Sequence, residues 1–147
     1  MSKPRYDWWG YARRIAEKWE QLRDEYEDLH RQSITANVSG MPTGNGVSRT
    51  IENIAIRSLP GHKQKEYEAA CFALSEVMKK PDVEKRISII KMYYWRKTMT
   101  IAGAGMKVGY AERTARRICW QYILAIGRGL GYITDDEYQV AMKKDNN

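Results

Sequence analysis

Residues 100–121 read Thr100-Ile-Ala-Gly-Ala-Gly-Met-Lys-Val-Gly-Tyr-Ala-Glu-Arg-Thr-Ala-Arg-Arg-Ile-Cys-Trp-Gln121, a pattern typical of a helix-turn-helix. Two helices that cross at a steep angle need small residues at the crossing, and Ala104 and Gly105 supply them. The turn needs a residue that tolerates a positive φ, which Gly109 does without strain. Thr100 is placed to cap the first helix. The apolar residues expected in the shared core are Val108, Tyr110, Ala115 and Ile118.

The second helix of this motif is predicted to run from about Ala111 through Ile126. Its buried face is expected to comprise Ala115, Ile118, Cys119, Tyr122, Ile123 and Ile126. The residues expected on its outer face are Glu112, Arg113, Arg116, Arg117 and Gln121. Apolar residues at helical spacing on one face and charged residues on the other predict an amphipathic helix that is half-buried.

The charged face matches what a helix in the major groove of B-DNA requires. Arginine can bind the O6 and N7 atoms of guanine with both arms, and Glu112 can accept from a cytosine amino group. We expect Arg113 and Arg117 to face base edges with Arg116 beside them, and Lys97 and Lys107 to contact phosphates. Ala111, Gln121 and Thr100 complete the predicted DNA-binding set. The alternative is a solvated basic face with no partner.

The distribution of charge supports a polyanionic partner. The chain of 147 residues has a net charge of +7, and residues 83–131 hold ten Lys and Arg against two Asp and Glu. Such a localised excess fits nucleic acid or an anionic membrane surface. No apolar run reaches the roughly 18–20 residues of a membrane span, and the N-terminus lacks the apolar segment of a signal peptide. We therefore expect a cytoplasmic protein whose partner is double-stranded DNA and not a membrane.

The remaining patterns predict an all-α fold. An N-terminal helix is expected from Asp7 to Gln32 within a segment 1–32. Its apolar residues are spaced as heptads: Trp8, Ala12, Ile15, Trp19, Leu22, Tyr26 and Leu29. Two interpretations of this stripe stay open, namely packing inside the chain and a coiled-coil seam between two copies, which would make a homodimer.

Four further segments follow the N-terminal helix. Residues 33–49, with three glycines and a proline, predict a flexible linker. Residues 50–80 predict a helical connector of two helices, 50–59 and 63–79. The second carries an apolar stripe of Tyr67, Ala70, Cys71, Leu74, Val77 and Met78. The helix-turn-helix domain is assigned to residues 81–131, with Pro81 in the first turn of a helix to about Arg96. Residues 132–147 are expected to form a short tail, in which Thr134 caps a last short helix.

No pattern of catalytic or metal-binding residues stands out. Cys71 and Cys119 lie among apolar residues and are expected to be buried free thiols. His30 and His62 are not spaced with them as a zinc site. No paired carboxylates and no nucleophile–base pair are recognisable. We expect no enzyme activity, no cofactor and no metal.

The segment from Arg86 to Gly131 resembles region four of sigma factors, through Tyr93-Tyr94-Trp95-Arg96-Lys97, the turn, and Glu112-Arg113-Thr114-Ala115-Arg116-Arg117. The whole chain is similar to small phage and prophage regulators of the RinA/ArpU type from Gram-positive bacteria. That similarity includes Tyr6-Asp7-Trp8-Trp9-Gly10-Tyr11, the linker residues 39–48, and Tyr94-Trp95-Arg96-Lys97. It implies activation of late phage genes and no catalysis. We predict that activation proceeds through contact with bacterial RNA polymerase or through its recruitment. One departure is Ala111, where the turn usually carries a serine cap, so the start of the recognition helix is not fixed by the resemblance.

Two other functions compete with a transcriptional regulator. A phage small terminase subunit also joins a helix-turn-helix to an oligomerising helical segment, although its DNA-binding part usually comes first. A ring-shaped oligomer would favour the terminase, whereas a monomer or dimer would favour the regulator. A purely structural helical protein is the third alternative, and failure to bind any duplex at low salt would favour it.

Overall fold

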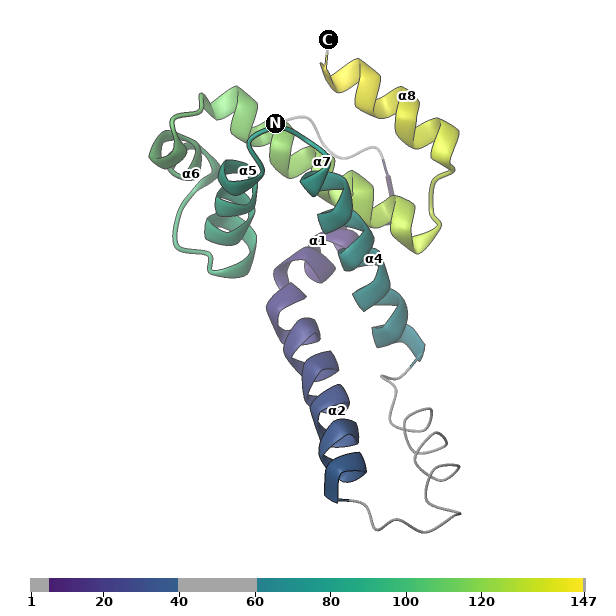
Figure 1. Cartoon of the computed structure of the whole chain (residues 1–147). Coiled ribbons are helices and arrows are strands. Elements are labelled where there is room, and N and C mark those ends of the chain that lie inside the picture. The colour runs from purple at the N-terminus through teal and green to yellow at the C-terminus, as the bar shows by residue number, and fades with distance from the viewer. Residues whose placement is uncertain (1–5, 40–60, 147) are drawn as a thin grey trace.

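The computed structural model describes residues 6–39 and 61–146, and over these ranges it is built of helices without strands. The all-α prediction is confirmed (Figure 1). Within the described ranges, no helix is both long enough and apolar enough to cross a bilayer. The helices are α1 (Trp9–Glu17), α2 (Trp19–Ser39), α4 (Gly61–Met78), α5 (Val83–Ile90), the π-helical segment η1 (Lys91–Trp95), α6 (Ile101–Val108), α7 (Glu112–Leu130) and α8 (Asp135–Asn146).

Helix α7 lies at the centre of the fold. Its residues 121–127 are all buried, because α1, α4, α5, α6 and α8 all pack against it. In Figure 1, α6 adjoins the N-terminal end of α7 and α8 folds back beside its C-terminal end. The buried apolar residues of α1, α4 and α7 belong to one continuous core. A helix buried on every side is apolar all round, as the run from Tyr122 to Ile126 is.

The N-terminal segment forms two helices where one was predicted. The helix is interrupted at Lys18, whose amide donates to the carbonyls of Arg14 and Ile15 at 3.1 Å each. The heptad spacing continues through this break, so the pattern gave no sign of it. Helix α2 then runs beyond the predicted end at Gln32 to Ser39. The rest of the predicted linker and the predicted helix 50–59 lie outside the described residues.

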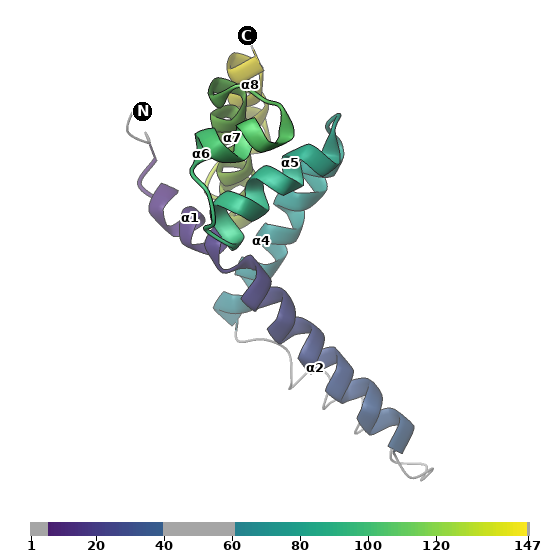
Figure 2. The ribbon, with the colours of Figure 1, turned by 90° about the vertical axis from the view of Figure 1, so that its left-hand side faces the viewer.

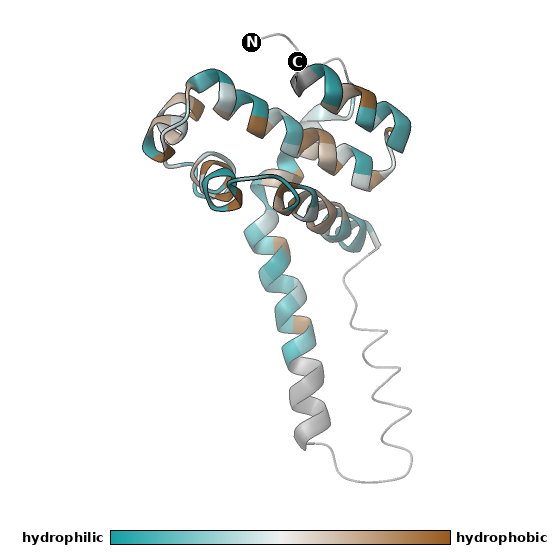
Figure 3. Ribbon diagram, turned by 45° about the horizontal axis from the view of Figure 1, so that its top comes forward, coloured by the Kyte–Doolittle hydropathy of each residue, from teal (hydrophilic) through white to brown (hydrophobic). Residues whose placement is uncertain are grey.

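The heptad stripe packs inside the same chain, with its α1 part mainly against α7 and its α2 part against α4. Ile15, Trp19 and Leu22 are buried, and the ring of Tyr67 stacks on Trp19 at 5.6 Å and on Tyr26 at 4.1 Å between centroids. These contacts support the interpretation that the stripe packs inside the chain. Self-association through the stripe stays a prediction. The far part of α2 projects from the other helices (Figure 2) and is mostly hydrophilic where its residues are described (Figure 3).

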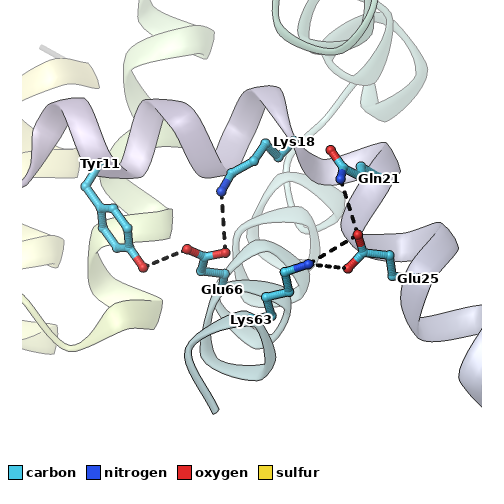
Figure 4. Close-up of polar contacts among 6 residues, drawn as sticks. All are labelled: Tyr11, Lys18, Gln21, Glu25, Lys63 and Glu66. Atoms are coloured by element: carbon cyan, nitrogen blue, oxygen red, sulfur yellow. Dashed lines mark hydrogen bonds and ion pairs between the residues drawn. The ribbon is translucent and has the colours of Figure 1, made fainter. Parts of the chain in front are cut away.

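A buried carboxylate joins α1 to α4 (Figure 4). Glu66 is 3% exposed, and its Oε1 accepts a hydrogen bond of 2.8 Å from the hydroxyl of Tyr11. The Nζ of Lys18 lies 3.7 Å from Oε2. Burial and the neighbouring carboxylate raise the pKa of Tyr11 to about 12. A second ion pair of 3.1 Å, between Lys63 and Glu25, links α4 to α2.

Three details of the remaining helices differ from prediction. Met78, expected on the apolar stripe of α4, is 63% exposed, although Val77 beside it is buried. Pro81 precedes α5 and is not in its first turn, since Asp82 takes a left-handed conformation at φ 56° before the helix begins. The last short helix predicted in the tail is present as α8, but it has 12 residues and buries Tyr138 and Met142.

The cap expected at Thr134 is confirmed. Its Oγ1 accepts from the amide of Glu137 at 3.2 Å, and the Glu137 carboxylate accepts from the amide of Thr134 at 3.5 Å. This reciprocal pair is a capping box, which satisfies amide groups at the start of the helix.

Candidate nucleic-acid interface

Helices α6 and α7 form the turn geometry that the sequence predicts. The Oγ1 of Thr100 accepts from the amide of Gly103 at 3.1 Å, which caps the start of α6. Gly109 ends α6 in the left-handed region at φ 87°. The amide of Tyr110 then donates to the carbonyl of Gly105 at 2.7 Å. The cap and the turn glycine are both confirmed.

The crossing of α6 and α7 leaves no space for a side chain at Gly105. A Cβ placed there would lie 3.0 Å from the Cβ of Ala115 and 3.0 Å from the carbonyl oxygen of Tyr110. Ala104, Ala115 and Ile118 are buried around this point, as predicted, whereas Val108 and Tyr110 are half-buried. The hydroxyl of Tyr110 donates to Asp82 at 2.8 Å. The turn is thereby tied to the start of α5.

Helix α7 starts at Glu112, which fixes the position that the alanine at residue 111 had left open. Ala111 is the N-cap in an extended conformation, and its side chain makes no capping hydrogen bond. The helix continues past the predicted end at Ile126 to Leu130. All six residues of the predicted buried face are buried. Solvent reaches mainly the N-terminal end of the helix, residues 112–117, which we call the recognition segment.

The charged residues of the recognition segment differ in their surroundings. Arg113 is exposed and forms no ion pair with any residue that the structure describes. Arg116 is exposed too, but its Nε lies 3.0 Å from a carboxylate oxygen of Glu112. Arg117 is half-buried. Glu112 and Arg116 therefore neutralise one another in the free protein.

Gln121 was predicted on the outer face, and that prediction is wrong. It is 8% exposed and lines a narrow gap beside Ala73 and Val77 of α4. At this level α4 packs against α7, so the side of the helix that is free at Arg113 is covered at Gln121. The position of a covering helix cannot be read from the periodicity of the helix that it covers.

The two predicted phosphate-binding lysines are exposed at opposite ends of α6. Lys107 lies in its last turn, and Lys97 precedes its first residue in a left-handed conformation at φ 54°. The Nζ of Lys97 lies 3.3 Å from Glu17 of α1. Next to it, the Nε of Arg96 lies 3.0 Å from Glu20 of α2. The segment that leads into α6 is thus held by carboxylates of the N-terminal helices.

Sequence reasoning missed Arg13 and Tyr93, which lie beside this segment. The Nη2 of Arg13 donates to the hydroxyl of Tyr93 at 3.3 Å. They are 80 residues apart in the sequence, so no local spacing could have revealed the contact. The π-helical form of η1 was also missed. Insertions of this kind often occur near functional sites, and η1 ends at Trp95, directly before the basic pair Arg96 and Lys97.

The described residues hold no group of three or more His, Cys, Asp and Glu side chains placed to bind a metal ion. Both cysteines are free thiols, with Cys119 buried and Cys71 half-buried. Burial raises the pKa of Cys119 to about 12, which keeps this thiol uncharged. The arrangement offers hydrogen-bond donors and positive charge around an exposed helix end. Comparison with known proteins finds no matching family model, no similar curated protein and no similar solved structure.

Proposed function

We propose that the protein binds duplex DNA in a sequence-specific manner through the recognition segment of α7 and regulates transcription. One observation carries this proposal: the N-terminal end of α7, which follows the glycine turn and the tight crossing with α6, is exposed, whereas residues 121–127 of the same helix are buried. In helix-turn-helix proteins, that end of the second helix contacts base edges in the major groove.

The contacts of each side chain support particular roles. Arg113 is free of ion pairs with described residues, so binding a guanine would not require it to leave a carboxylate. Arg116 and Glu112 would have to exchange their mutual contact for base contacts. Lys107 and Lys97 flank α6 and suit phosphates. The net charge of residues 83–131, +8 from ten basic and two acidic residues, favours association with a polyanion.

We further propose activation of late phage genes with contact to bacterial RNA polymerase. This proposal is supported by the resemblance of residues 93–97 and 112–117 to sigma region four and by the similarity to RinA/ArpU-type regulators. Expression of a reporter gene fused to DNA from the parent phage measures whether the protein activates transcription. Activation is the expected result, and repression or an unchanged signal with expression confirmed would contradict it.

The test of DNA binding begins with selection of bound sequences from a random duplex pool. Affinity for the selected site is then measured at several salt concentrations for Arg113→Ala, Arg117→Ala and Lys107→Ala, with the exposed Lys143→Ala on α8 as the control. An arginine bound to guanine contributes roughly 1–3 kcal/mol of discrimination, so its loss relaxes specificity at one base pair. Loss of a phosphate contact weakens all sequences alike and lowers the salt slope by about one.

Circular dichroism first establishes that each variant keeps its helices. Wild-type protein that binds no duplex at low salt would refute DNA binding and favour a structural protein. Full affinity in both arginine variants would show that the recognition segment does not read the sequence.

A further inference from the structure

Helix α1 and the segment that leads into α6 enclose an open recess, which we call the α1 recess. Its walls include Arg13 and Glu17 of α1, Tyr93 of η1, and Lys97 and Thr100. Figure 2 shows α1 alongside this segment. The recess thus joins the N-terminal end of the chain to the start of the helix-turn-helix.

Two cations are held side by side in the α1 recess. One carboxylate oxygen of Glu17 lies 3.4 Å from the Nε of Arg13, and the other lies 3.3 Å from the Nζ of Lys97. The hydroxyl of Tyr93 accepts from the Nη2 of Arg13 at 3.3 Å. Two contacts therefore fix the plane of the Arg13 guanidinium before any partner arrives.

Both cations keep free donors that face solvent. The side chains of Arg13 and Lys97 are 50% and 62% exposed, whereas that of Glu17 is 26% exposed. A guanidinium carries five N–H donors and an ammonium three, so the contacts with Glu17 and Tyr93 leave several unused. The recess thus holds two positive charges against the one negative charge of Glu17, and its unused donors face solvent.

The backbone of Lys97 takes a left-handed conformation, at φ 54°, which is unusual for a residue with a side chain. A left-handed conformation suits glycine and disfavours a lysine, because the Cβ approaches the backbone. Such a conformation persists where the surroundings hold it. Here the amide of Thr98 donates to the carbonyl of Met92 at 2.9 Å, and the Lys97 side chain reaches Glu17.

We propose that the α1 recess binds the phosphate backbone of duplex DNA, with Arg13 as a phosphate-binding residue supplied by the N-terminal helix. This inference rests on the proposed function. In a helix-turn-helix, the first helix crosses the backbone while the second enters the major groove. The recess opens at Thr100, the cap of that first helix, so a strand that crosses α6 there meets Arg13 and Lys97.

The test uses the full chain and the selected duplex, with affinity measured across salt concentrations for Arg13→Gln and for Arg14→Gln. Arg14 is a matched control, because it is exposed on the same helix and outside the recess, and its loss changes net charge equally. Arg13→Gln should weaken every sequence alike by roughly fivefold to tenfold at low salt and reduce the salt slope by about one. Arg14→Gln should change both much less.

Arg13→Lys provides the second variant, since it keeps the charge and the helical preference. It should restore the wild-type salt slope while recovering only part of the affinity, because lysine lacks the planar fork. Equal behaviour of Arg13→Gln and Arg14→Gln would overturn the inference and leave DNA binding by α7 intact. Absence of duplex binding by the wild type would instead overturn the proposed function itself.

Discussion

Replacing Gly105 by alanine should destabilise the protein, although the same change usually favours a helix. The new Cβ would meet the Cβ of Ala115 and the carbonyl oxygen of Tyr110, each at 3.0 Å. Neither neighbour can rotate away, because one is a buried methyl and the other is backbone. Overpacking costs about 1–3 kcal/mol, and the helical preference of alanine over glycine returns about 1 kcal/mol. We expect a net loss of about 1 kcal/mol.

Gly10→Ala is the matched control for this experiment. A Cβ at Gly10 in α1 would have no neighbour within 4 Å, so only the favourable change in helical preference remains, at most about 1 kcal/mol. Denaturant unfolding of both variants measures the two free energies of unfolding. A Gly105→Ala protein as stable as the Gly10→Ala protein would refute the argument that this crossing is tightly packed. Gly105→Val, which adds two more methyl groups at the crossing, should lose more stability still.

Three further predictions concern the cap, a thiol and assembly. Thr100→Ala removes the side-chain acceptor for the amide of Gly103 and should lower the free energy of unfolding by about 1 kcal/mol; an unchanged midpoint of thermal unfolding would show that water replaces the cap. Burial raises the pKa of Cys119 from 9.0 to about 12. The buried neutral thiol therefore makes its full contribution to the free energy of unfolding below pH 9, and this contribution is lost as the pH rises towards 12. Cys119 should accordingly resist iodoacetamide at about pH 8, just below the usual thiol pKa, until the chain unfolds. Mass spectrometry maps the alkylated residues, and rapid alkylation of Cys119 in the native protein would contradict its burial. The heptad stripe predicts self-association, which light scattering measures; a monomer at high micromolar concentration would assign Trp19 and Leu22 to the intramolecular core alone.

The features that the sequence predicted well are those set by neighbours a few residues away. The cap at Thr100, the left-handed Gly109 and the buried face through Tyr122 follow from local hydrogen bonding, conformational preference and helical periodicity. Each of these needs only the residues of one or two turns. Helices α6 and α7 and the turn between them can therefore be located from the amino-acid sequence alone.

The features that escaped prediction depend on which helix lies against which. Gln121 continues the polar face of α7 in sequence, yet α4 covers it. The break at Lys18 interrupts a heptad pattern that has no gap, because α1 packs against α7 while α2 packs against α4. The pairing of Glu17 with Lys97 joins distant segments. Contacts of this kind are fixed by tertiary packing, which periodicity along one helix does not encode.

The burial of α7 has a consequence for engineering. Its residues 121–127 belong to the core that α1 and α4 complete, so a fragment beginning near residue 81 would expose large apolar side chains such as Tyr122 and Ile126. The helix-turn-helix is therefore not a portable module. Under the proposed function, changes of DNA preference would be confined to the solvent-facing positions among residues 112–117, where substitution leaves the core untouched. Grafting a foreign specificity then means exchanging those few side chains while the rest of the helix stays as it is.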